Sequence, residues 1–220
     1  MMNNTYYPKP EAIIFDWDGV LVESLDFIKQ AFQFTLEKIQ PLQAIDVNSM
    51  PSLSLRNYFP SVFGDKAKKA EDVFYDYIAS QHLKVLAPTL GAGDLLRSLY
   101  DLQIPLCIIS NKKGELLRKE VDYLSWTGYF RGIIGAGDCV EDKPSSVPVM
   151  HVLGPLGLAP SKSVWFIGDT SVDMECASQS GCFGVLMCEE KKYLNNKGIA
   201  SDMVVFSCKD LKGKLINNKI

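Results

Sequence analysis

The stretch that decides the fold is IIFDWDGVLVES, residues 13–24. It opens with apolar residues and reaches a first carboxylate at Asp16. An apolar run without polar alternation is typical of a strand that is buried on both faces of a sheet. Because side chains alternate along a strand, Asp16 and Asp18 are expected to point to one side and Trp17 to the other. Gly19 has no Cβ and allows the chain to turn sharply after the strand.

Two carboxylates crowded at the end of a buried strand repel each other unless a cation or a catalytic role keeps them there. A simpler reading is that they are solvated acids at a strand–loop junction. The pair alone leaves both interpretations open.

The rest of the chain alternates short apolar runs with helical patterns. This rhythm predicts an α/β fold with a doubly wound, Rossmann-like parallel sheet. The expected strands are 12–15, 105–110, 132–134, 163–168, 183–187 and 202–206, and the expected helices are 91–102, 114–124, 146–156 and 172–180.

One interval interrupts the rhythm. Residues 21–86 contain no strong strand pattern, but 24–40 and 66–86 have the apolar spacing of amphipathic helices. A polar stretch with several prolines, 41–63, separates them. We therefore expect two domains: an α/β core formed by 1–20 and 87–220, and an inserted α-helical cap formed by 21–86. The crossings between them are expected near residues 20–23 and 86–91.

Three more polar clusters follow predicted strands or precede predicted helices. Ser110 and Asn111 end the second strand, Lys143 precedes a helix in EDKPSS, and Asp169 and Asp173 belong to GDTSVD. In open α/β sheets, ligands bind outside the carboxyl ends of the strands. These side chains and the first two aspartates are therefore expected to converge in one crevice.

With these four clusters in order, DWDGV, IISN, DKP and GDTSVD, the chain resembles the haloacid dehalogenase superfamily of hydrolases. The resemblance covers nearly the whole chain, including the position of the cap. Within the superfamily, the sequence is most similar to the group of phosphoglycolate phosphatase and β-phosphoglucomutase. The resemblance implies an enzyme, a phosphoric monoester hydrolase.

The resemblance also implies roles for the aspartates. Asp16 would be the nucleophile that accepts the phosphoryl group. Asp18 would be the general acid and base, and its backbone carbonyl would be a metal ligand. Asp16, Asp169 and Asp173 would complete an Mg²⁺ site, since hard oxygen ligands suit this ion.

The remaining site residues would hold the substrate. Ser110 would donate a hydrogen bond to a phosphoryl oxygen, and the backbone near Asn111 would complete the cradle. Lys143 would supply a positive charge to the same group.

Three functions remain open from the sequence. The first is an Mg²⁺-dependent phosphatase acting on a small organic phosphate monoester such as phosphoglycolate. The second is a phosphomutase of the β-phosphoglucomutase type, which uses the same aspartyl phosphate. The third is a non-catalytic phosphate-binding module. For Arg56, in the predicted cap, two roles are open: binding of a substrate carboxylate or phosphate, and the favoured one, an ordinary surface position.

Composition excludes several other classes. The chain has 220 residues, 47% of them hydrophobic, and a net charge of −3. These values exclude a disordered chain and give no general attraction to nucleic acid. No apolar run approaches the length of a membrane span. The six cysteines lack CxxC spacing, which indicates free thiols and a reducing, cytoplasmic location. The expected partner is a small phosphate ester.

Overall fold

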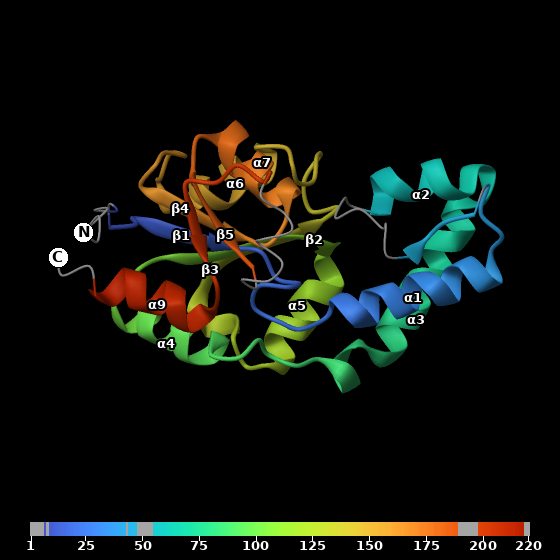
Figure 1. Cartoon of the computed structure of the whole chain (residues 1–220), viewed down its shortest axis with the longest axis horizontal. Helices are drawn as coiled ribbons and strands as arrows, with labels where there is room; N and C mark the ends of the chain where they lie inside the picture. The colour runs from blue at the N-terminus through green and yellow to red at the C-terminus, as the bar shows by residue number, and fades with distance from the viewer. Residues whose placement is uncertain (1–6, 8, 43, 48–54, 189–197, 218–220) are drawn as a thin grey trace.

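The computed structural model describes residues 7, 9–42, 44–47, 55–188 and 198–217, and it shows an α/β sheet with helices on both faces (Figure 1). All neighbouring strands are parallel and their order is β3-β2-β1-β4-β5-β6. The strands are β1 (Ala12–Phe15), β2 (Leu106–Lys113), β3 (Phe130–Ala136), β4 (Val164–Gly168), β5 (Phe183–Met187) and β6 (Met203–Val205). The predicted doubly wound, Rossmann-like fold is confirmed.

Helices cover the sheet because side chains of the strands alternate between two apolar layers. In β1, Ile13 and Phe15 pack in one layer, whereas Ile14 packs in the other. The first layer is covered by α4 (Ala92–Asp101), α5 (Gly114–Tyr123) and α9 (Cys208–Asn217). The second is covered by α6 (Val147–Leu153) and α7 (Ser171–Ser180), on the opposite side of the sheet in Figure 1. Short 3-10 turns are η3 (Thr127–Tyr129) and η4 (Gly154–Leu156).

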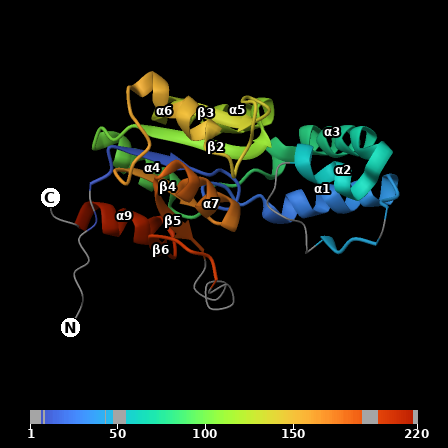
Figure 2. The same cartoon turned by 90° about the horizontal axis from the view of Figure 1, so that it is seen from above.

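A third apolar cluster lies beyond the sheet, in the helices that follow β1. These are α1 (Leu25–Lys38), α2 (Leu55–Phe63) and α3 (Ala67–Val85), with the 3-10 turn η2 (Gly64–Lys66) between the last two. They form a separate group at the end of the molecule away from both termini (Figures 1 and 2). Four phenylalanines fill their shared interior: Phe32, Phe59, Phe63 and Phe74.

Helix α2 corrects the sequence analysis, which expected the polar stretch 41–63 only to separate two helices. Pro60 lies inside this helix. However, Leu55, Phe59, Val62 and Phe63 are all buried, and their spacing of four, three and one residues places them on one helical face. Burial of that face against α1 and α3 outweighs the backbone hydrogen bond that proline cannot donate.

Two smaller observations bear on the sequence analysis. All six cysteines are free thiols, and four of them are buried. None of the helices in the described ranges combines the length and the apolar character that a bilayer crossing needs.

Candidate active site

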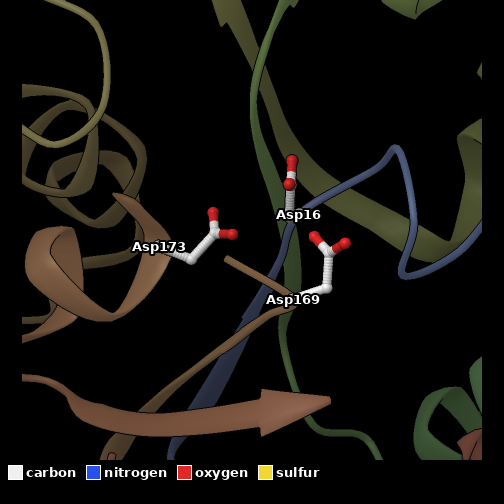
Figure 3. A group of neighbouring side chains, drawn as sticks. All are labelled: Asp16, Asp169 and Asp173. Carbon is white, nitrogen blue, oxygen red and sulfur yellow. The ribbon is translucent and has the colours of Figure 1, made fainter. Parts of the chain in front are cut away.

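The predicted site residues meet at the carboxyl ends of β1, β2 and β4. Asp16 follows β1 directly, and its backbone N–H extends the parallel ladder by donating to the Ile167 carbonyl at 2.8 Å. Its side chain lies with those of Asp169 and Asp173 so that one oxygen from each is within 4.8 Å of the others. Figure 3 shows the three carboxylates close together, with those of Asp169 and Asp173 directed toward the side of Asp16.

Lys143 is the buried cation of this cluster. Its Nζ lies 2.8 Å from Asp16 Oδ1 and 2.6 Å from Asp173 Oδ1. Burial alone would lower the pKa of Lys143, but the charges of Asp16 and Asp173 outweigh burial and raise it above its ordinary value. The lysine therefore remains protonated and offsets part of the carboxylate charge.

Asn111 holds the loop that carries Lys143. Its side chain accepts a hydrogen bond from the Lys143 N–H at 3.1 Å and donates one to the Lys143 carbonyl at 3.2 Å. Ser110, the preceding residue of β2, is buried, and it lines a pocket together with Asp16 and Lys143. Asn111 thus acts on the position of Lys143 through the backbone, a contact that sequence reasoning did not predict.

Asp173 caps a helix and also faces the carboxylate cluster. It is the third residue of α7 and forms a capping box with Thr170, whose hydroxyl donates to Asp173 Oδ2 at 2.5 Å. The other carboxylate oxygen accepts from Lys143. A carboxylate is favoured at a helix N-terminus by the exposed N–H groups. The same contacts fix Asp173 so that it faces Asp16.

Asp169 is the least satisfied member of the cluster. It follows β4, and its buried Oδ1 has no hydrogen-bond partner in the described part of the chain. Burial, and then the charges of Asp173 and Asp16, raise the pKa of Asp169 well above its ordinary value. Gly19 makes room for this side chain, because a Cβ at that position would lie 2.3 Å from Asp169 Oδ2. Gly19 also has a φ of 81°, which favours glycine.

Asp18 lies outside the three-carboxylate cluster. Its Oδ1 accepts a hydrogen bond from Lys112 Nζ at 2.7 Å and another from the Ser24 hydroxyl. Asp16 and Asp18 both line the pocket, while the ring of Trp17 is fully buried against Trp126. The expected alternation of these three side chains is therefore confirmed.

Sequence reasoning missed a buried network behind Asp18. Glu120, on α5, accepts hydrogen bonds from Trp17 Nε1 at 2.6 Å and from Lys112 Nζ at 2.7 Å, and pairs with His82 Nδ1 at 2.8 Å. Burial alone would raise the pKa of Glu120, but the contacts from His82, Lys112 and Trp17 outweigh it and lower the value. Lys112 directly follows Ser110 and Asn111, which were predicted as site residues. This position was the only feature of the sequence that pointed to the network.

The pocket beside these residues has a volume of about 260 Å³ and lies between the strand ends and the helices after β1. Its floor carries Asp16, Asp18, Ser110, Lys143 and Asp169. Its opposite wall is mostly apolar and is formed by Leu25, Ile28, Leu55, Phe74 and Ile78. The side chain of Arg56 lies outside the described residues.

Comparison with known proteins agrees with this geometry. The model of the family described as haloacid dehalogenase-like hydrolase matches residues 13–187. The chain belongs to the haloacid dehalogenase-like hydrolases. It is 30% identical over 173 residues to a phosphoglycolate phosphatase of Aquifex aeolicus, covering 77% of this chain and 81% of the relative. A phosphoglycolate phosphatase of Neisseria meningitidis is also 30% identical, over 188 residues, with 80% and 79% covered.

Solved structures give the same assignment. A haloacid dehalogenase superfamily hydrolase from Ehrlichia chaffeensis is 30% identical with a TM-score of 0.67, covering 96% of this chain and 98% of the other. A family protein from Streptococcus pneumoniae has a TM-score of 0.75 at 22% identity, with 92% and 97% covered, and shows the shared fold. This hydrolase thus falls in the phosphoglycolate phosphatase-like group, and the prediction of a phosphatase enzyme is confirmed.

Proposed function

We propose that this hydrolase is an Mg²⁺-dependent phosphatase that cleaves small phosphate monoesters of the phosphoglycolate type through an aspartyl phosphate on Asp16. The observation that carries the proposal is the convergence of Asp16, Asp169 and Asp173 around the ammonium of Lys143 at the floor of a pocket. The relatives named phosphoglycolate phosphatase support the substrate class. We also propose that residues 21–86 act as a cap over a core formed by 1–20 and 87–220.

The carboxylate cluster fits Mg²⁺. Its donors are hard oxygens, which this ion prefers. Asp169 Oδ1 is buried without a hydrogen-bond partner among the described residues, and an orphaned carboxylate oxygen in such a place is costly unless a cation compensates it. Asp16, Asp169 and Asp173 would hold the ion, with the Asp18 carbonyl as a further ligand. Bound Mg²⁺ would offset the repulsion between the Asp16 carboxylate and the anionic phosphate.

The first half-reaction belongs to Asp16 and Asp18. Asp16 Oδ1 is already engaged with the Trp17 N–H and Lys143 Nζ, so we assign the attack on phosphorus to Oδ2. The bond from phosphorus to the ester oxygen breaks, and Asp18 donates a proton to the departing alcohol. Ser110 and Lys143 hold the phosphoryl oxygens during the transfer.

The second half-reaction reverses the role of Asp18. Its carboxylate now accepts a proton from water, whose oxygen attacks the phosphorus of the aspartyl phosphate. The bond between phosphorus and Asp16 breaks, inorganic phosphate leaves, and both carboxylates return to their starting forms. Lys112 Nζ lies 2.7 Å from Asp18 Oδ1 and holds this side chain at the pocket during both half-reactions.

The test is phosphate release from 2-phosphoglycolate by Asp16→Asn. We expect a loss of about a thousandfold or more, since an amide is a poor nucleophile and removal of a nucleophile is among the most severe changes an enzyme can undergo. Asp101→Asn is the matched control, because Asp101 is an exposed aspartate at the end of α4, and should retain full activity. Chelation should abolish the activity of the unaltered protein, and added Mg²⁺ should restore it.

Two results would contradict the proposal. Retention of more than a few per cent of activity in Asp16→Asn would exclude this residue as the nucleophile. Rapid interconversion of glucose 1- and 6-phosphate with little release of inorganic phosphate would indicate a mutase instead.

A further inference from the structure

The cations of the pocket are unequally paired. Within the described ranges, lysines at four positions line the pocket. Lys143 is paired with Asp16 and Asp173, Lys112 with Asp18 and Glu120, and Lys113 with Glu115 at 2.7 Å. Among the residues that the structure describes, Lys29 has neither a carboxylate within ion-pair distance nor a hydrogen-bond partner.

Lys29 differs from the other three in its place as well. It lies on α1, in the wall opposite the strand ends, and it is partly buried. Its neighbours on that wall are apolar, among them Leu25, Ile28 and Phe74. An ammonium in apolar surroundings without a counter-charge is unfavourable, and an anion brought by a ligand would relieve that cost.

The same wall limits the uncharged part of the ligand. Apart from Lys29 and Tyr75, the described side chains that α1, α2 and α3 contribute to the pocket are apolar. The hydroxyl groups of a sugar would lose their hydrogen bonds to water at this wall and gain few in return, so binding of a sugar there is unfavourable. A short alcohol that ends in an anionic group meets both the apolar wall and the lysine.

We propose that Lys29 is a specificity-determining residue that binds an anionic group on the leaving alcohol, so that the substrates are short phosphate monoesters with a second negative charge. This inference rests on the proposed function, because it assumes that the phosphoryl group occupies the floor of the pocket. A carboxylate, as in phosphoglycolate, and a second phosphate would satisfy the same ammonium.

The test compares two short esters, one with this charge and one without it. 2-Phosphoglycolate carries the carboxylate, and 2-hydroxyethyl phosphate carries a neutral hydroxymethyl group in its place. Lys29→Met should lower kcat/KM for the first about 10- to 100-fold, as expected for a lost hydrogen bond to a charged group, and change the second less than about threefold. Lys29→Arg should restore most of the loss. Propane-1,3-diol bisphosphate and 3-hydroxypropyl phosphate distinguish a second phosphate from a carboxylate.

Lys38→Met is the matched control. Lys38 lies on the same helix, is exposed, does not line the pocket and stacks over Phe34. Its removal should leave both substrates unaffected. An equal loss on both esters in Lys29→Met would place this lysine at the transferred phosphoryl group and overturn the proposal, as would an unchanged kcat/KM for 2-phosphoglycolate.

A binding measurement separates this inference from the proposed function. 3-Phosphonopropionate keeps the carboxylate of phosphoglycolate but has a methylene in place of the ester oxygen, and propylphosphonate lacks the carboxylate. By titration calorimetry with Mg²⁺, Lys29→Met should weaken the first about 10- to 100-fold and leave the second unchanged. If the protein hydrolyses neither ester, the proposed function fails, while the difference between the two phosphonates still supports or refutes the role of Lys29.

Discussion

As the proposed nucleophile, Asp16 must be negatively charged to attack phosphorus, yet its position opposes that charge. It is only 7% exposed. Burial raises the pKa of its carboxyl to about 7 from an ordinary 3.8, even though Lys143 acts in the opposite direction. Asp173 and Asp18 add to the increase. Asp16 is therefore fully ionised near neutral pH only if additional positive charge reaches the cluster.

This conflict predicts a pH-dependent effect of Mg²⁺ on stability. With a folded-state pKa near 7 and an ordinary value of 3.8, the folded protein holds a proton that the unfolded chain has lost. The contribution of Asp16 to stability thus falls as pH rises through this window. Mg²⁺ binds the ionised carboxylate and competes with that proton. The increase in Tm caused by Mg²⁺ should be small at about pH 5.5 and larger at about pH 8.

Thermal unfolding with and without Mg²⁺ at both pH values checks this prediction. In Asp16→Asn the residue can no longer titrate, so the gain in Tm should be reduced at the higher pH. An equal gain in the unaltered protein at the two pH values would argue against cation binding to Asp16.

At the scale of single elements, α5 contributes the buried carboxylate that positions Lys112. Glu120 contacts Trp17 after β1, Lys112 in β2 and His82 in α3. One side chain thus joins the sheet to the last turn of the longest helix in the proposed cap. Lys112 in turn reaches Asp18, so the network fixes the surroundings of the proposed general acid.

Glu120→Gln should lower the free energy of unfolding by about 1–3 kcal/mol, because three buried partners lose a charged acceptor. Phosphatase activity should fall as well, since the Lys112 ammonium loses the carboxylate that directs it toward Asp18. Chemical denaturation measures the first effect and kcat the second.

Glu115→Gln is the control for Glu120→Gln. Glu115 lies on the same helix but is exposed and pairs with Lys113. An exposed ion pair contributes about 0–1 kcal/mol. Equal losses of stability in the two variants would show that the buried network contributes no more to the free energy of unfolding than an exposed ion pair does.

The elements show which features a sequence pattern can predict. The run 12–15 matches β1 residue for residue, and β4 and β5 begin within one residue of expectation, because a strand buried on both faces is uninterrupted in sequence. Helix α2 was missed because a proline was given more weight than the periodic burial of Phe59 and Phe63. The carboxyl ends of parallel strands lie at one edge of a sheet. For this reason the sequence alone predicted that the four motifs meet in space.

Such rules do not predict the buried polar network around Glu120. Glu120 lies in the helical stretch GELLRKEVDY, where an acidic residue is ordinarily solvated. Its burial depends on His82 from α3 and Trp17 from the turn after β1, and no local pattern predicts which distant side chains will meet. The same holds for Lys29, whose lack of a partner among the described side chains is evident only when the other charges of the pocket are accounted for.

At the scale of the whole molecule, the two chain crossings between the sheet and the helices α1–α3 lie side by side. The Glu23 N–H donates to the Ala87 carbonyl and the Thr89 N–H donates to the Leu21 carbonyl, each at 2.9 Å. Val22 and Pro88 form an isolated bridge between them. These residues lie within 20–23 and 86–91, where the sequence analysis expects the linkers, and the division into core and cap stays a prediction.

The pocket makes opposite demands on this arrangement. Substrate must enter between the strand ends and α1, and water must be excluded while the phosphoryl group is transferred. A rotation of α1–α3 about the paired crossings would meet both demands and would strain the two hydrogen bonds that join them.

We expect orthovanadate with Mg²⁺ to change the rate of amide hydrogen exchange at Glu23 and Thr89. Amides of β5, which is buried in the sheet away from the pocket, should be unaffected. The prediction is wrong if vanadate binds, as shown by an increase in Tm, while exchange at both crossings stays the same. In that case the helices do not rotate about the two crossings, and the site admits its substrate without cap rotation.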